Sequence, residues 1–222
     1  MKLVKTFAAQ SFVVLIGLAT WLPNCYSAEV RVSVVDRKDR AVPNVVVYAE
    51  PKFTARSSNP AQAVMNQVNG HFAPHILVVE TGTDIVFPNT DVVSHHVYSF
   101  SEANRFELPL YKGMAHPPRK FDKPGLVVLG CNIHDNMLGY VLIVDSPHFA
   151  LTDEDGSANI PDLAPGEYTI RVWTPRAQES DVPDGEEMVL DATSLAHVDF
   201  RFSARLHPPH ESADSSLSWV HY

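Results

Sequence analysis

Cysteine is almost absent from this chain. The 222 residues contain two cysteines, Cys25 and Cys131, and Cys25 falls within an N-terminal stretch that has the pattern of a cleaved leader. A chain left with Cys131 alone cannot close an internal disulfide, which excludes a disulfide-stabilised scaffold. A single thiol in an oxidising compartment is therefore either buried and inert or a metal ligand.

The chain also lacks an apolar run long enough to span a membrane. The apolar run Phe12–Leu22 covers about eleven residues, whereas a membrane-spanning helix needs about twenty. Two lysines precede this run and small residues ending at Ala28 follow it, so residues 1–28 are predicted to be a secretory signal peptide. We therefore expect a periplasmic protein with no transmembrane segment after cleavage. A lipoprotein acylated at Cys25 is the alternative, although small residues are missing just before that cysteine.

Positive charge is scarce as well. Once the leader and its two lysines are removed, 15 basic and 26 acidic residues remain, which gives a net charge of −11. Binding to phosphate backbones needs a basic surface, so no nucleic-acid partner is expected, whereas a basic protein partner remains compatible. The chain also lacks a Gly-x-Ser-x-Gly elbow, a His-Glu-x-x-His helix and a phosphate-binding glycine loop. We therefore predict no enzyme activity.

Short β-type segments are what the chain has instead. Alternating apolar and polar residues at Val30–Val35 and at Tyr168–Trp173 are typical of half-buried strands, and no helical period extends beyond two turns. Seventeen prolines and many turn residues separate such segments, which predicts an all-β protein. Polar residues 52–70 and 111–120 are interpreted as loops.

The segments fall into two predicted β-sandwich units with a boundary near Ser146. The first unit is predicted to cover residues 29–146 and the second, smaller unit residues 147–204. Residues 205–222 are polar and proline-containing, and are predicted to form a flexible tail.

One stretch carries the chemistry, residues 130–137, which contain the pattern Cys-x2-His-x2-Met. The pattern follows an apolar run, Leu126–Leu129, so a turn at the end of a strand could direct all three side chains to one point. A thiolate, an imidazole and a thioether together suit copper, whereas magnesium and calcium prefer oxygen ligands. A second imidazole is available from His95 or His96 upstream. Alternation along a strand places these two histidines on opposite faces, and the pattern alone leaves the choice open.

Three segments together resemble a known family. Residues 82–89, 95–100 and 130–139 resemble the cupredoxins, with a Cys-His-Met spacing most similar to amicyanin. The sequence of residues 95–100 and 130–135 resembles that of the cupredoxin-like proteins called methylamine utilization proteins. The chain departs from small blue-copper proteins at Gly130, where an aromatic residue is common, and at Asp135, beside the expected ligand.

The resemblance implies a fold, a cofactor and a ligand set. It implies a Greek-key β-sandwich that holds one type 1 (blue) copper and exchanges single electrons with a redox partner protein. The implied ligands are His95, Cys131, His134 and Met137, with His96 as a hydrogen-bonding neighbour. Two other functions stay open: a periplasmic protein that holds or delivers copper without electron transfer, and a β-sandwich interaction module without metal.

The second unit carries a weaker pattern. Residues 147–203 resemble a small carboxypeptidase-regulatory-like sandwich, which implies a scaffold or a contact surface. His71 and His75 could form a second copper site, but histidines in solvated loops are the more common occurrence, and we expect none there.

Overall fold

The computed structural model describes residues 27–53, 61–114 and 116–209. The described residues confirm the all-β prediction, and they contain a single short helical turn, the 3-10 helix η1 (Glu179–Asp181). None of the described helices is long and apolar enough to cross a membrane. The predicted signal peptide falls almost wholly, and the predicted tail largely, outside the described residues.

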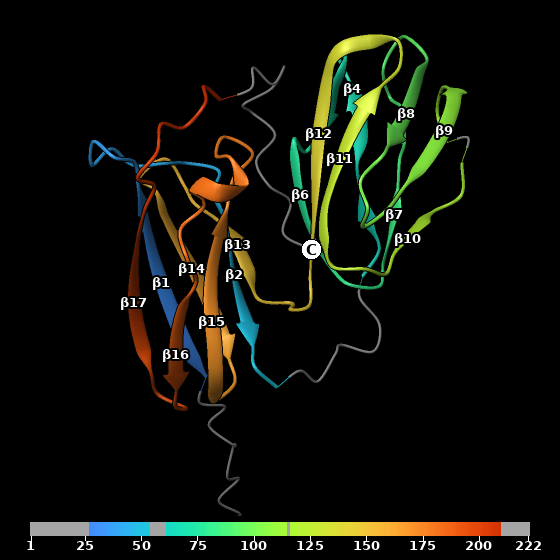
Figure 1. The fold of residues 1–222 in the computed structure, drawn as a ribbon. Helices are drawn as coiled ribbons and strands as arrows, with labels where there is room; N and C mark the ends of the chain where they lie inside the picture. The colour runs from blue at the N-terminus through green and yellow to red at the C-terminus, as the bar shows by residue number, and fades with distance from the viewer. Residues whose placement is uncertain (1–26, 54–60, 115, 210–222) are drawn as a thin grey trace, which may run out of the picture.

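Two sandwiches lie side by side (Figure 1). We call residues 61–146 the central sandwich. It consists of a five-stranded sheet of order β6–β12–β11–β8–β9, a three-stranded sheet of order β10–β7–β3, and a hairpin of β4 and β5. The strands are β3 (Ala63–Val64), β4 (Asn66–Val68), β5 (His71–Ala73), β6 (Ile76–Glu80), β7 (Thr83–Val86), β8 (His95–Ser99), β9 (Phe106–Tyr111), β10 (Arg119–Phe121), β11 (Gly125–Cys131) and β12 (His134–Val144).

The other sandwich is built from both ends of the described chain. We call residues 27–53 and 147–209 the terminal sandwich. One sheet has the order β14–β1–β17 and the other the order β13–β2–β15–β16. The strands are β1 (Ala28–Val35), β2 (Val46–Pro51), β13 (Phe149–Leu151), β14 (Ser157–Leu163), β15 (Gly166–Trp173), β16 (Glu186–Leu190) and β17 (Leu195–Arg201).

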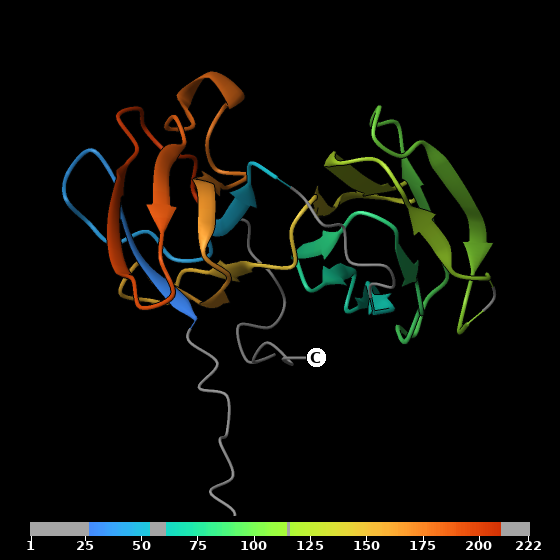
Figure 2. The ribbon, with the colours of Figure 1, turned by 90° about the horizontal axis from the view of Figure 1, so that it is seen from below.

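This strand pairing differs from the unit boundaries expected from the sequence. Residues 29–51 were expected to belong with the strands that precede residue 146. Instead β1 pairs with β14 and β17, and β2 pairs with β13 and β15. The alternation of β1 shows that one face is buried, but it holds no information on which distant strand covers its edges. The central sandwich is thus an insertion between β2 and β13 (Figure 2).

A third group of buried side chains joins the two sandwiches. Val46 of β2 packs with Ile76 and Val78 of β6 and with Leu142 and Val144 of β12. Tyr140 and Trp173 add an edge-on ring contact across the same interface, at 5.8 Å between ring centroids. β12 is accordingly buried on both faces over its last four residues, 141–144. An unbroken apolar run of this kind is typical of a strand with both faces covered.

Two segments interpreted as loops contain short strands. β3 and β4 lie within residues 52–70, and β10 begins at Arg119 within residues 111–120. Two or three paired residues with at most one buried side chain leave no periodic signal that a sequence window could detect. β4 and β5 matter for the site, because they place Gly70 and Phe72 close to it.

Candidate metal centre

A two-residue turn brings Cys131 and His134 together. β11 ends at Cys131, β12 begins at His134, and the two residues are direct partners across the hairpin. The register shifts between Gly130 and Cys131, which marks a β-bulge at this point. Bulges re-aim side chains, so the irregularity allows Cys131 and His134 to point toward the same place.

The neighbouring strand β8 supplies the third residue. Cys131 pairs with Val97 of β8, and the backbone N–H of Asn132 donates to the carbonyl of His96 at 3.0 Å. His95 shares the face of Val97, and both residues have no exposed surface. Strand alternation alone did not show which of the two histidines faces the core. In the fold, His95 points into the sandwich and His96 points away from it.

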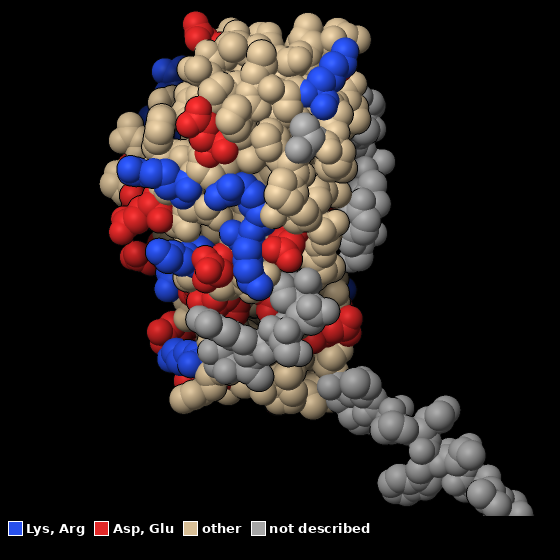
Figure 3. Space-filling model, turned by 90° about the vertical axis from the view of Figure 1, so that its right-hand side faces the viewer, with Lys and Arg blue, Asp and Glu red and all other residues tan. Residues whose placement is uncertain are grey.

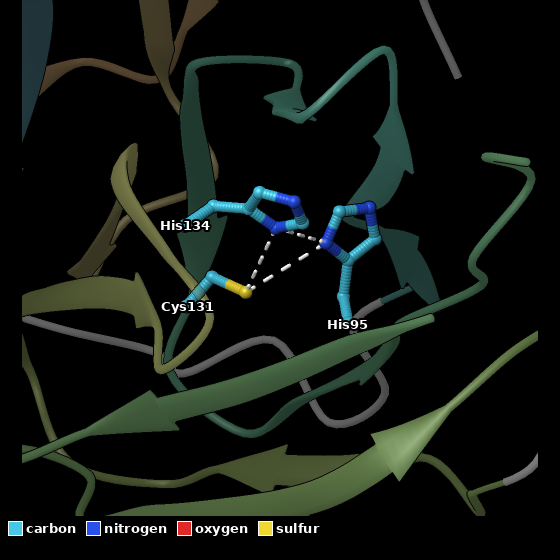
Figure 4. Close-up of side chains that lie close together, drawn as sticks. All are labelled: His95, Cys131 and His134. Carbon is cyan, nitrogen blue, oxygen red and sulfur yellow. Dashed lines mark hydrogen bonds between the residues drawn. The ribbon is translucent and has the colours of Figure 1, made fainter. Parts of the chain in front are cut away.

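Three donor atoms converge at this end of the sandwich (Figure 4). The Nδ1 atoms of His95 and His134 lie 3.1 Å apart, and each lies 3.7 Å from Sγ of Cys131. A metal at about 2.0–2.1 Å from each nitrogen and about 2.3 Å from sulfur would space its ligands about 3.3–3.8 Å apart. The two sulfur–nitrogen sides of the triangle fall within this range, and the nitrogen–nitrogen side is shorter than it by a few tenths of an ångström. Within the described part of the chain, these residues form the one His/Cys/Asp/Glu group of three with donor atoms this close.

The remaining expected ligands lie in different surroundings. Met137 follows His134 on β12, is 2% exposed, and belongs to the same apolar core as Cys131. His96 lies outside the group of three, and its Nε2 contacts Oε1 of Glu107 at 2.7 Å near the surface. The structure thus brings together His95, Cys131 and His134, buries Met137 nearby in sequence, and does not bring His96 to the centre.

A buried carboxylate, that of Asp91, contacts the ring nitrogen of His95 that is not part of the triangle. Its Oδ2 lies 3.0 Å from Nε2 of His95, and its two oxygens also accept the N–H groups of Gly70 and Val92, each at 2.6 Å. Burial acts to raise the pKa of Asp91, but these N–H groups and the His95 ring together hold the pKa below its ordinary value. An ionised Asp91 can only accept, so Nε2 of His95 carries the proton and Nδ1 presents its lone pair to the centre.

Asp91 was not identified from the sequence. Its only signal is its position four residues before His95, within an irregular loop where that spacing implies no contact. The contact arises because Asn89 holds the loop in shape: its side-chain amide donates to the carbonyls of Val93 and Tyr111, and its side-chain oxygen accepts the N–H of Asp91.

Gly130 is explained by the strand beside it. A Cβ atom at this position would lie 2.8 Å from the Tyr98 ring, which packs over the glycine from β8. An aromatic residue thus covers the backbone next to Cys131, but it comes from the neighbouring strand. Gly139 is covered in the same manner by Phe72, whose atoms would lie 2.8 Å from an added Cβ.

The surface beside the centre is partly apolar. His134 is the one member of the group that is not fully buried. Its neighbour in the turn, Ile133, is 50% exposed, and Val92, next to Asp91, is 83% exposed. Asp135 is exposed on the same hairpin.

A Ser–His–Asp set occurs in the terminal sandwich but does not form a relay. Oγ of Ser33 lies 3.2 Å and Oδ1 of Asp199 3.1 Å from the same nitrogen of His197, Nε2. A nucleophile relay needs the serine and the carboxylate on opposite ring nitrogens. This set therefore offers no activated nucleophile.

No protein-family model and no curated protein matches the chain. Solved structures similar to part of it include a novel purple cupredoxin from Nitrosopumilus maritimus, at 21% identity and a TM-score of 0.34 over 37% of this chain and 100% of that one. A mutant of amicyanin in its reduced state gives 19% identity and a TM-score of 0.34 over 44% of this chain and 99% of that one. The copper-containing nitrite reductase from Thermus scotoductus gives 23% identity and a TM-score of 0.37 over 44% of this chain and 26% of the enzyme. With scores this low, the function rests on the geometry of the centre itself.

Proposed function

We propose that the protein is an exported, copper-binding electron carrier with a type 1-like site. His95, Cys131 and His134 would hold one copper ion, with Met137 as a weak fourth ligand. The observation that carries this proposal is the triangle of two imidazole nitrogens and one cysteine sulfur, 3.1, 3.7 and 3.7 Å on its sides. Two imidazoles and a thiolate in a near-trigonal arrangement, with a weak axial thioether, are the donors of a blue-copper centre.

The chain holds these donors in place before any ion binds. Cys131 and His134 are fixed by a two-residue hairpin, and the hairpin is bonded to β8 through Asn132. His95 is fixed from the other side by Asp91. Copper would supply a one-electron couple, and ligands that cannot rearrange keep the structural change between its two oxidation states small. We propose a carrier because this set of donors suits the exchange of single electrons.

Electron exchange would take place through the exposed edge of His134. The adjacent turn presents Ile133 to solvent. Figure 3 shows the side of the central sandwich around β9 and β10, where charged residues of both signs gather in the lower half and are sparser toward the upper end. β11 ends and β8 begins at that upper end (Figure 1). Apart from the exposed Asp135, the exposed side chains beside the centre include the apolar Ile133 and Val92, and a small surface of this kind suits brief contact with a redox partner protein.

The proposed location and group follow from the sequence. The pattern of residues 1–28 supports export to the periplasm. The sequence of residues 95–100 and 130–135 supports membership of the group called methylamine utilization proteins. This is the name of a family, and it implies no methylamine substrate. The terminal sandwich is proposed to act as a scaffold or a contact surface.

Adding Cu(II) to the purified protein tests the proposal. We expect one equivalent to bind and to give a strong visible thiolate-to-copper absorption band that bleaches on reduction. Cys131→Ala should abolish the band, whereas His96→Gln, which replaces the adjacent histidine outside the triangle, should retain it.

Other outcomes would identify other functions. Colourless binding with a preference for Cu(I) would indicate a protein that holds or delivers copper. Absence of stoichiometric binding, or unchanged binding by Cys131→Ala, would contradict a copper site at the triangle and leave an interaction module.

A further inference from the structure

A cavity of about 510 Å³ lies between the two sandwiches. The central sandwich contributes His71, His75 and the outer face of β12, including Asn136. The terminal sandwich contributes Arg176, after β15, and His207, after β17. The cavity therefore exists only because the two sandwiches are packed together. Its lining combines side chains that can donate hydrogen bonds with apolar ones, among them Leu138 and three prolines.

The wall from the terminal sandwich is a fixed structure. Nε of Arg176 donates to the carbonyl of His207 at 2.9 Å, and the N–H of His207 donates to the carbonyl of Arg176 at 2.8 Å. These reciprocal bonds tie two segments that are 31 residues apart in sequence. They use Nε of the guanidinium, while the two terminal nitrogens of Arg176 take no part in them.

The opposite wall is ordered as well. Nδ1 of His75 lies 3.1 Å from the carbonyl of Leu138, which can only accept, so Nδ1 carries the proton. The Tyr140 ring packs against the His75 ring at 88°, with 5.3 Å between centroids. Asn136 is exposed and presents its side-chain amide from the start of β12.

The charge of the cavity has one sign. Among the described residues, no aspartate or glutamate lines it, and no carboxylate oxygen lies within 4 Å of the Arg176 guanidinium. The acid that acts on Arg176 electrostatically is Asp36, which is itself hydrogen-bonded to Arg40. Burial lowers the pKa of Arg176, which shows that water solvates its charge incompletely. A half-buried guanidinium without a carboxylate partner favours an anion beside it.

The spacing of the donors distinguishes an anion from a metal ion. A metal site needs donor atoms that converge, and within the described ranges only His95, Cys131 and His134 do so. The histidines of the cavity are instead distributed around a space far larger than one ion. We propose that this cavity is a binding site for a small polyvalent anion with several charged oxygens, a class that includes di- and tricarboxylates and phosphates.

Calorimetric titration of the metal-free protein with citrate, and separately with inorganic phosphate, tests this proposal at constant ionic strength. We expect saturable binding of at least one of the two, and the stronger one identifies carboxylate or phosphate as the oxygen source. Arg176→Gln should weaken binding by about tenfold or more, because a charge-assisted hydrogen bond is lost. Arg171→Gln is the matched control, because it removes the same charge from an exposed arginine that is paired with Glu50.

A second variant keeps the wall intact. Asn136→Asp places a negative charge in the cavity without removing the bonds between Arg176 and His207, and it should abolish binding of both anions. Amide chemical-shift changes in the unsubstituted protein should centre on Leu138 and Arg176. The proposal is overturned by the absence of saturable binding, by equal losses in Arg176→Gln and Arg171→Gln, or by unchanged binding in Asn136→Asp. Because no copper is present, these outcomes are independent of the proposed metal site.

Discussion

The two sandwiches bury different kinds of side chain. In the terminal sandwich the buried polar residues are Thr152 and Thr174, together with Asp36 in a turn at the surface. The central sandwich buries an imidazole, a carboxylate and two side-chain amides, those of His95, Asp91, Asn89 and Gln67. The apolar cores differ as well, because that of the terminal sandwich is mostly valine and alanine, whereas that of the central sandwich contains four phenylalanines and two methionines.

The difference indicates where the fold serves a function. Burying a carboxylate or an imidazole is unfavourable unless each polar atom is hydrogen-bonded, and an apolar core would avoid this cost. In the central sandwich, Asp91 is hydrogen-bonded to His95 of the triangle through its side chain and to the Asn89 side chain through its backbone N–H. The terminal sandwich has no comparable cluster of buried ionisable groups among its described residues, which fits a structural role.

The largest expected effect tests whether the buried carboxylate supports the metal centre. Asp91→Asn removes the charge that fixes the His95 ring, and copper affinity should fall by about 10–100-fold, the usual effect of losing such a partner. The matched control is Glu107→Gln, which alters the exposed carboxylate paired with the adjacent His96 and should leave affinity unchanged. Competition with a copper chelator measures both. Equal copper affinities in the two variants would contradict a special role for the buried Asp91–His95 pair compared with the exposed Glu107–His96 pair.

A smaller effect tests how tightly each sandwich is packed. Gly139→Ala places a Cβ atom 2.8 Å from Phe72 in the central sandwich and should reduce the free energy of unfolding by about 1–3 kcal/mol. Gly166→Ala begins a strand of the terminal sandwich, where the nearest atom, in Tyr168, lies 3.7 Å away. It should change stability by less than about 1 kcal/mol. Urea unfolding followed by tryptophan fluorescence checks both, and a larger loss at Gly166 would reverse the comparison.

The smallest effect concerns the turn of the terminal sandwich. The Arg40 side chain, followed by the N–H groups of Lys38 and Arg40, lowers the pKa of Asp36 from 3.8 to about 2. A carboxylate with a depressed pKa in the folded state stabilises the fold above its unfolded pKa. The contribution should therefore be complete above about pH 5 and be lost as the pH falls from about 4 toward 2. Asp36→Asn should flatten this part of the stability–pH curve. A curve identical to that of the unsubstituted protein would contradict the assigned role of Asp36.

Part of the fold could be predicted from local pattern alone. Alternation identified the strands around Val30 and Tyr168, and continuous apolar residues identified β11 and the end of β12. The all-β class follows from such segments. The pairing of β1 with β14 and β17 could not be predicted in this way, because it joins residues more than 100 positions apart. Every strand with one apolar face offers the same local signal to many possible partners.

Part of the candidate site could likewise be predicted from local sequence, and part depended on the tertiary structure. The sequence by itself determined that Cys131 and His134 would lie together, because a two-residue turn between strands leaves little freedom in their separation. It also provided two adjacent histidines upstream. Only the tertiary structure decided between them, because the face of β8 that is buried depends on the sheet packed against it.

Tertiary packing also determines the contact of Asp91 with His95, the position of the Tyr98 ring over Gly130, and the cavity between the sandwiches. Each is a contact between segments whose separation is set by the packing of sheets and loops. The sequence thus determined the chemical character of the metal centre through residue types at short spacing. The tertiary structure determined which imidazole turns inward and which carboxylate holds it, because those choices depend on which polar groups the packed core can satisfy.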